Sequence, residues 1–531
     1  MTSVRAAIAF ALAALAAWCG AARAEDVDRF RLVLHGRFTD RENQPDPSLR
    51  FDRATKAFDL APYLRPQGSD VYGSTFAAVS AEGRRGWFRW ALGADTGELR
   101  SQAFPRPVTV CSSKLPSGLD VAGQGTCTVT VTGRRTLYTV EETQLAAARL
   151  TANGRPLGDE VRSTLLLREA WVGAALGRNE VALLKAGRKR FTVADGFVYD
   201  DYGTGVEATF DLGAIGPSWD LGAAAFYPTR DFPRRAGVTS PMVALRADFL
   251  PSLFEHAGLF LAFYRDQTSS VADLFRGSLA EPSVVRLLAS PPGSAAYQDE
   301  ERNLAATFGS ARESDGGLGW LGTSGSLAFR GALKLDWTGA LALGRVTFRI
   351  ADATETTQDT VFGQLAHLRL RAAVTREVEV GGFFLFLSGD LPPTEKARLG
   401  LPQRYGGFLG IAPYVTATNI FFTGGVAETF ASRQATAPGV NGRGVIAPGL
   451  TASWDPLRAL AVDARAAYLV APTAGPFGGR VYGPELDLEV TWSPREWLSF
   501  AVEGDALFPG DFFPGRAPVT KIVLGFDLVG M

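Results

Sequence analysis

The chain has 531 residues, among them 59 glycines, 35 phenylalanines and 10 tryptophans, but only 3 each of cysteine, methionine and histidine. Charged residues make up 21% and the formal net charge is −1, which excludes a disordered polyelectrolyte and a typical nucleic-acid binder with its basic excess. Because histidine and cysteine are scarce, we expect no metal, no cofactor and no enzymatic activity.

Residues 1–24 have the three parts of a secretory signal peptide. Arg5 provides a positive charge, an apolar run follows from Ala6 to Ala17, and Ala22-Arg23-Ala24 has the small-x-small pattern of a cleavage site. A membrane anchor needs about 20 apolar residues, and this run is shorter. We therefore expect a cleaved signal peptide and a secreted mature chain over residues 25–531.

Cleavage would leave two cysteines, Cys111 and Cys127, in the mature chain. In an oxidising compartment we expect them to form one disulfide that closes a loop, with two free thiols as the alternative.

Four segments lack the pattern of a strand, and we interpret them as long loops. They are residues 41–68, 101–160, 266–301 and 390–405. Loops of this length are usually functional or disordered. The last contains Pro392-Pro393, and we interpret it as a turn, a plug or a gate.

One stretch carries a motif that goes beyond alternation. Its pieces are Leu167-Arg168-Glu169-Ala170-Trp171, Lys185-Ala186-Gly187-Arg188-Lys189-Arg190, Asp195-Gly196, Asp201 and Gly205-Val206-Glu207-Ala208-Thr209-Phe210-Asp211. This succession resembles the alginate-export family of outer-membrane porins, over about 50 of the 531 residues. The resemblance implies a monomeric barrel that conducts an anionic polysaccharide through a lumen rich in arginine.

By that resemblance, Arg188 and Arg190 are the principal candidates for lumenal cations, and Asp195 and Asp201 are the candidates for their partners. Lys189 belongs to the same predicted path but lies, with Lys185, on the opposite face of the strand. Strict alternation cannot place all these cations in the lumen, so a bulge or a position beyond the lipid is required. The alternative is a charged strand end at the level of the lipid headgroups.

Alternation with period two recurs along the chain. Residues 327–337 place Leu, Phe and Trp on one face and Ala, Arg, Lys and Asp on the other, as successive side chains of a strand do. The same pattern occupies 485–492, 498–505 and 522–528. A soluble β-sandwich or propeller is the alternative, but it would need about twenty such strands, many with aromatic residues near their ends. We therefore predict an all-β fold, a transmembrane antiparallel β-barrel.

The size of the barrel follows from the length of a strand. With roughly 10–12 residues per tilted strand and long loops on one side, about 16 to 20 strands fit, and 18 is the best estimate. A barrel of this size encloses water, so we expect a water-filled lumen. The predicted location is the outer membrane of a Gram-negative cell.

Basic residues are expected to line one side of the lumen. They lie on what we interpret as the polar face of three successive strands: Arg330, Lys334, Arg345, Arg349, His367, Arg369 and Arg371. Neighbouring strands are about 4.8 Å apart, so these side chains would form a basic wall that attracts carboxylates.

Acidic residues are expected on another side of the lumen, on strands near the C-terminus. They are Glu485, Asp487, Glu489, Glu503 and Asp505. Separated acidic and basic walls would produce a transverse field, as in general diffusion porins. A further possibility is that the charges pair across the lumen and stiffen it.

The sequence thus leaves three functions open. The main hypothesis is passive export of an acidic exopolysaccharide, with the driving force supplied by periplasmic and inner-membrane secretion partners. The alternative is a general or anion-selective porin for polar solutes. A third is a surface adhesin or structural barrel that acts through the loop with Cys111 and Cys127. All three place the protein in a lipid bilayer, as a monomer and without nucleic acid.

Overall fold

The structure is a computed structural model, and most of the described chain is extended strand. The structure describes residues 29–42, 50–52, 57–59, 70–96, 99–102, 108–111, 113–114, 120–121, 127–130, 137–139, 166–214, 218–228, 240–252, 255–267, 312–329, 332–350, 356–391, 404–411, 413–422, 442–475, 478–513 and 517–530, with isolated positions within 290–299, within 396–400 and at 439. The predicted signal peptide lies outside these residues.

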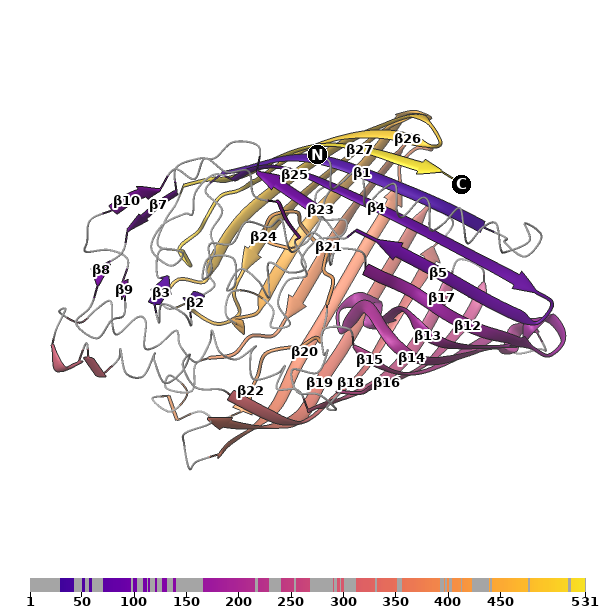
Figure 1. Cartoon of the computed structure of the whole chain (residues 1–531), viewed down its shortest axis with the longest axis horizontal. Coiled ribbons are helices and arrows are strands. Elements are labelled where there is room, and N and C mark those ends of the chain that lie inside the picture. The colour runs from indigo at the N-terminus through magenta and orange to yellow at the C-terminus, as the bar shows by residue number, and fades with distance from the viewer. Residues whose placement is uncertain are drawn as a thin grey trace.

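Eighteen of the described strands form a closed antiparallel barrel, in which each strand pairs with its neighbours in chain order and β1 pairs with β27 (Figure 1). They are β1 (Arg29–Glu42), β4 (Asp70–Arg85), β5 (Phe88–Asp95), β12 (Leu166–Leu176), β13 (Ala182–Val193), β14 (Tyr199–Asp211), β15 (Trp219–Pro228), β16 (Met242–Ser252), β17 (Glu255–Asp266), β18 (Arg312–Phe329), β19 (Leu333–Ile350), β20 (Thr356–Ala373), β21 (Val378–Leu387), β23 (Val445–Leu457), β24 (Leu460–Val470), β25 (Val481–Arg495), β26 (Leu498–Leu507) and β27 (Val519–Gly530). The prediction of an 18-stranded barrel is confirmed.

The two faces of the wall differ as the alternation predicts. On β17, Leu259, Leu261 and Phe263 point outward and are exposed, whereas Ala262 and Tyr264 point inward and are buried. Exposed apolar side chains around a closed barrel have a favourable environment in lipid. Closure also leaves no free strand edge, as a membrane-spanning sheet requires. The protein is therefore a transmembrane β-barrel of the outer-membrane type.

The two ends of the barrel differ in the length of their connections. At one end the turns are short: β4 ends at Arg85 and β5 begins at Phe88, and β23 ends at Leu457 and β24 begins at Leu460. At the other end β21 and β23 are separated by residues 388–444. In barrels of this type the short turns face the periplasm and the long loops face outward. We call these the turn end and the loop end.

The remaining elements belong to the connections. The short strands are β2 (Arg50–Asp52), β3 (Ala57–Asp59), β6 (Leu99–Gln102), β7 (Val108–Cys111), β8 (Ser113–Lys114), β9 (Asp120–Val121), β10 (Cys127–Thr130), β11 (Leu137–Thr139) and β22 (Arg404–Tyr405), and the 3-10 turns are η3 (Arg178–Glu180), η4 (Ala194–Gly196) and η5 (Leu212–Ala214). The backbones of β7 and β10 pair with Cys111 directly opposite Cys127. The disulfide itself stays a prediction. Among the described residues, no helix is long and apolar enough to span a membrane.

One predicted strand is instead two strands and the turn between them. Residues 327–337 were expected to form a single strand, but β18 ends at Phe329 and β19 begins at Leu333, with the two residues paired. The apolar and polar faces nevertheless match the prediction, because a hairpin keeps paired residues on one face of the sheet. Alternation alone therefore does not locate the turn.

Candidate functional site

A segment between β21 and β23 begins with β22, which pairs with β20 in the wall, and then lies inside the barrel at the loop end. We call residues 404–411 and 413–422 the crossing segment. Its first part is bound to β18. Trp320 is an inward residue of that strand, and its indole N–H donates a hydrogen bond of 2.7 Å to the carbonyl of Leu409. Phe408, Leu409 and Ile411 are buried in one apolar cluster with inward side chains of the wall. The crossing segment therefore packs against the inner face of β18 and its neighbours.

The turn between β13 and β14 also points into the lumen and meets the crossing segment. The backbone N–H groups of Ile411 and Tyr414 donate to the carbonyls of Val198 and Gly196, at 2.8 and 2.9 Å. A side chain at Gly410 would meet the carbonyl oxygen of Phe197, since a Cβ built there lies 2.5 Å from it. The two segments are thus in close backbone contact within the lumen.

The far part of the crossing segment is bound to the predicted acidic wall on β25 and β26. Glu485 accepts hydrogen bonds from the Thr418 hydroxyl at 2.9 Å and from the backbone N–H groups of Ile420 and Phe421, the latter at 3.1 Å. Carboxylates that accept several such bonds form strong contacts, because the acceptor is charged. Glu485 is completely buried by this contact.

Asn419 connects the same segment to three further charged residues. Its backbone N–H donates to Asp487 at 3.3 Å, its side-chain amide donates to Asp505 at 3.0 Å, and its carbonyl accepts from the Lys521 ammonium at 2.8 Å. Lys521 also forms ion pairs with Glu503 at 2.8 Å and with Asp505 at 3.2 Å. The acidic wall is therefore a binding surface for the crossing segment, with one buried lysine as its counter-charge.

These contacts place the crossing segment across the lumen. It reaches from β18 and the β13–β14 turn on one side to β25, β26 and β27 on the other. The sequence predicted a water-filled lumen and a loop at 390–405. The structure adds a segment that extends to residue 422 and, with an apolar cluster, occupies the loop end of the lumen.

The base of the long connection is held by a buried ion pair outside the barrel strands. The Lys396 ammonium contacts the Asp390 carboxylate and also donates to the carbonyl of Arg404. Burial raises the pKa of the Asp390 carboxyl, and the positive charge of Lys396 opposes this shift. The pair therefore fixes the point at which the chain enters the lumen.

One group of basic side chains faces the lumen from β19 and β20, toward the turn end. Lys334, Arg369 and Arg371 share the inward faces of these strands, and we call them the basic patch. Arg371 pairs with Asp336 at 2.6 Å. No carboxylate pairs with Arg369 in the part of the chain that the structure describes, and its side chain is exposed to the lumen.

The other predicted members of the basic wall lie elsewhere. Arg345 shares the outward face of β19 with exposed Leu341 and Leu343, so its predicted lumenal position is corrected. Lys334 lies on the inward, polar face of β19. Arg345 is an odd number of residues away along the same strand and must lie on the other face. Arg330 and the side chain of Arg349 lie outside the described residues. His367 points inward, and its ring centre lies 5.2 Å from that of Phe197.

Arg188 and Arg190 are not lumenal, which corrects the principal prediction from the resemblance. They share the outward face of β13 with exposed Leu184, because the strand pairs in continuous register with both neighbours and contains no bulge. Arg190 forms a two-point contact with Asp200, at 2.6 and 2.5 Å. The predicted partner Asp201 lies opposite Phe191, on the inward face of the wall, and not on the face of the two arginines.

The lysines of β13 face the lumen in their place. Lys189 pairs with Glu207, and the Lys185 ammonium lies 4.9 Å from the centre of the Trp171 ring. Asp195 accepts a hydrogen bond from Thr338 across the lumen, and Asp201 is buried beside the backbone N–H of Tyr202. Of the β13 cations that reach the lumen, Lys189 is therefore neutralised by Glu207, and Lys185 lies over an aromatic ring.

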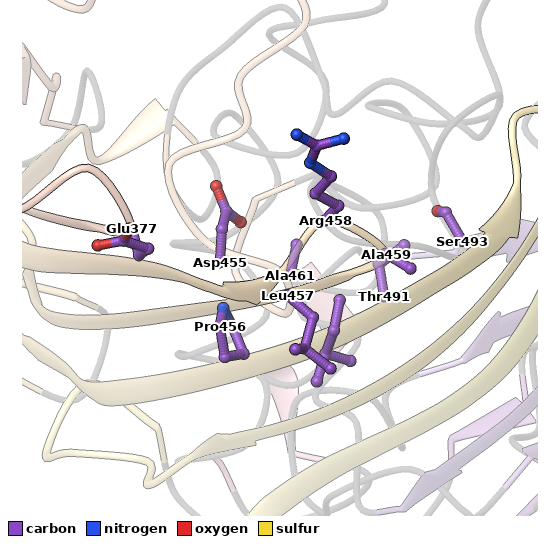
Figure 2. A pocket seen from close by; sticks show the side chains of 10 residues that line it. Glu377, Asp455, Pro456, Leu457, Arg458, Ala459, Ala461, Thr491 and Ser493 are labelled. Carbon is purple, nitrogen blue, oxygen red and sulfur yellow. The ribbon is translucent and has the colours of Figure 1, made fainter.

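A hollow of about 450 Å³ lies at the turn end of the β23–β24 hairpin. Figure 2 shows Asp455 and Arg458 on one side of the ribbon and Pro456 and Leu457 on the other. Among the described residues, no group of three or more His, Cys, Asp and Glu is arranged to hold a metal ion. A solute that enters the barrel meets the crossing segment and the basic patch.

No protein-family model and no curated protein match the sequence, so the resemblance to alginate-export porins gains no support from them. Solved structures are similar in architecture. OccK9 (OpdG) of Pseudomonas aeruginosa has 13% identity and a TM-score of 0.44, over 94% of this chain and 98% of that one. OccAB4 of Acinetobacter baumannii has 8% identity and a TM-score of 0.44, over 96% and 98%. The outer-membrane protein OpdK of P. aeruginosa has 11% identity and a TM-score of 0.42, over 94% and 98%. The arguments below depend on the residues of this chain alone.

Proposed function

We propose that the protein is a passive outer-membrane channel for small polar solutes, with a preference for anions. The observation that carries this proposal is the crossing segment, which narrows the lumen while the basic patch remains open to it. A narrowed lumen admits small molecules more readily than a hydrated polymer. This is the solute-porin alternative of the sequence analysis rather than polysaccharide export.

The preference for anions follows from which charges a solute can meet. Four carboxylates of the acidic wall, Glu485, Asp487, Glu503 and Asp505, are at most 5% exposed, because the crossing segment and Lys521 cover them. In contrast, Arg369 is exposed, and the Lys334 side chain is 42% exposed. Charges that contact water in the lumen act on a passing ion, whereas buried and paired charges do so much less.

Export of an acidic polysaccharide has less support. The resemblance implied an arginine-rich lumen based on Arg188 and Arg190, and both point toward the lipid side of the wall. No secretion partner is needed for passive diffusion of a solute. Coupling to such partners therefore does not form part of the proposal.

Reversal potentials in planar bilayers with a salt gradient test the proposal. The wild-type channel is expected to favour chloride over potassium, and Arg369→Ala is expected to reduce this preference about two- to fivefold, since one unpaired charge near the ion path contributes up to about 1 kcal/mol. Arg188→Ala is the matched control, because it removes an arginine from the outward face. A channel that prefers cations, or that responds equally to both substitutions, would contradict the proposal.

Block by a polyuronate separates the two transport hypotheses. A solute channel narrowed by the crossing segment is expected to conduct ions without long-lived block by the polymer. A polymer that enters from the turn end and blocks the current for long periods would favour export instead.

A further inference from the structure

Three arginines form a row across the outside of the barrel at the loop end. The strand register places Arg265 of β17 opposite Gly317 of β18, and Gly317 opposite Arg345 of β19. Arg345 lies opposite Thr360 of β20, and Thr360 lies opposite Arg404 of β22. We call Arg265, Arg345 and Arg404 the arginine row. Its members are two strands apart, which is about 10 Å.

The row lies where the apolar outer surface of these strands ends. Phe263 and Leu343 lie two positions nearer the turn end than Arg265 and Arg345. Both point outward and are 49% and 41% exposed. A Cβ built at Gly317 would lie 3.0 Å from the ring of Phe263, so this ring lies next to the glycine between Arg265 and Arg345. Two residues along a strand cover about 7 Å. The guanidinium groups therefore lie at the height of lipid headgroups, directly beyond the acyl-chain region.

The opposite border of the apolar surface has a different composition. At the turn end, the outward side chains of this part of the wall include Phe249 of β16 and Phe329 of β18, which are 39% and 46% exposed. Aromatic rings suit the interface of an ordinary phospholipid leaflet. Arginine at the other border indicates a leaflet whose headgroups carry more negative charge.

Two arginines of the row have described contacts. Arg265 pairs with Asp315 at 2.8 Å, and both side chains are well exposed, at 46% and 67%. Arg404 lies over the ring of Phe362, with 5.6 Å between the guanidinium carbon and the ring centre. Arg265 and Arg404 are both exposed, so a lipid headgroup can reach their guanidinium groups.

We propose that the arginine row binds the phosphate groups of an outer-leaflet lipid. The occupant must be a lipid rather than a free anion, because the row continues directly into exposed apolar surface that acyl chains would cover. Guanidinium groups match phosphate oxygens in pairs, which an ammonium group cannot do. This surface is separate from the lumen and does not depend on the proposed channel function.

Retention of lipid A, a glucosamine lipid with two phosphate groups, tests the proposal by native mass spectrometry. The protein is reconstituted in phosphatidylcholine nanodiscs that contain the lipid, and Arg265→Gln/Arg345→Gln is compared with the wild type. The double variant is expected to bind about 25-fold more weakly, since each basic residue near a charged membrane surface contributes about fivefold. Arg376→Gln/Arg458→Gln, at exposed positions of the turn end, is the matched control.

Several results would overturn the proposal. Equal retention by the wild type and the double variant, or an equal loss in the control, would show that the row does not bind the lipid. Inorganic phosphate bound as tightly as the lipid would show that the apolar surface contributes nothing. Arg265→Lys/Arg345→Lys keeps both charges but loses the paired donors, so it is expected to bind more tightly than the Gln double variant and less tightly than the wild type. An unchanged urea midpoint of unfolding in lipid vesicles shows that the barrel of each variant is intact.

Discussion

The basic patch and the acidic wall follow the same alternating pattern in the sequence, but most side chains of the patch are exposed and most of those of the wall are buried. Each is a set of charged side chains on the inward face of neighbouring strands. Lys334 and Arg369 contact the open lumen, whereas Glu485 and Asp505 are buried beneath the crossing segment. The comparison teaches that a lumenal charge affects permeation only if nothing else in the barrel binds it. Acidic residues are suited to binding an internal segment, because a carboxylate can accept hydrogen bonds from the N–H groups of an irregular backbone.

The largest expected effect comes from removing the counter-charge of the acidic wall. Lys521→Met leaves the buried carboxylates of Glu503 and Asp505 without their ion pair, which typically destabilises a protein by about 3–5 kcal/mol. The urea midpoint of unfolding in lipid vesicles measures this loss. Lys334→Met is the control on the basic patch. Its ammonium is 3.8 Å from Asp336 and partly exposed, so about 1 kcal/mol or less is expected. Equal shifts would show that the two sets of charges do not differ in burial.

The next effect concerns the contact between the acidic wall and the crossing segment. Glu485→Ala removes the acceptor of the Ile420 and Phe421 N–H groups, and each buried donor left unpaired costs about 1–3 kcal/mol. The crossing segment is then expected to leave the wall part of the time, which raises single-channel conductance severalfold and exposes residues 404–422 to protease. Glu489→Ala is the matched control. Glu489 lies on the same strand face but accepts a hydrogen bond from Thr491 rather than from the segment. Unchanged conductance in Glu485→Ala would contradict the role given to the wall.

Alternation predicts the barrel wall because one physical rule, lipid on one side and the lumen on the other, applies to every strand. The inward positions of Glu485, Asp487 and Lys334 follow from this rule. So does the outward position of Arg188, which shares its face with Leu184, but the resemblance to arginine-rich porins suggested the opposite. Within a regular strand, the parity set by the nearest leucines is therefore better evidence than a short motif.

The crossing segment could not be placed from the sequence, because irregular backbone has no period. Its contacts depend on single side chains, such as Asn419, that meet partners far away in the chain. One signal was available. Phe408-Leu409 and Ile420-Phe421-Phe422 are apolar runs in a long connection, and such runs in a solvated loop would be unfavourable. They indicate that this connection is buried, although not where it binds.

The smallest expected effect tests the other side of the crossing segment, where apolar packing replaces ionic contact. Trp320→Phe keeps an aromatic ring in the cluster but removes the hydrogen bond to the Leu409 carbonyl, at a cost of about 1 kcal/mol. Because Phe408, Leu409 and Ile411 remain buried by their neighbours, protease cleavage within 404–411 is expected to rise only a fewfold, and conductance is expected to stay near the wild-type value. Trp492→Phe is the control, since that indole lies on the outward face and is 51% exposed. If Trp320→Phe opened the channel as fully as Glu485→Ala, a single hydrogen bond would hold the segment on this side. The contrast between packed and ionic contact would then have to be abandoned.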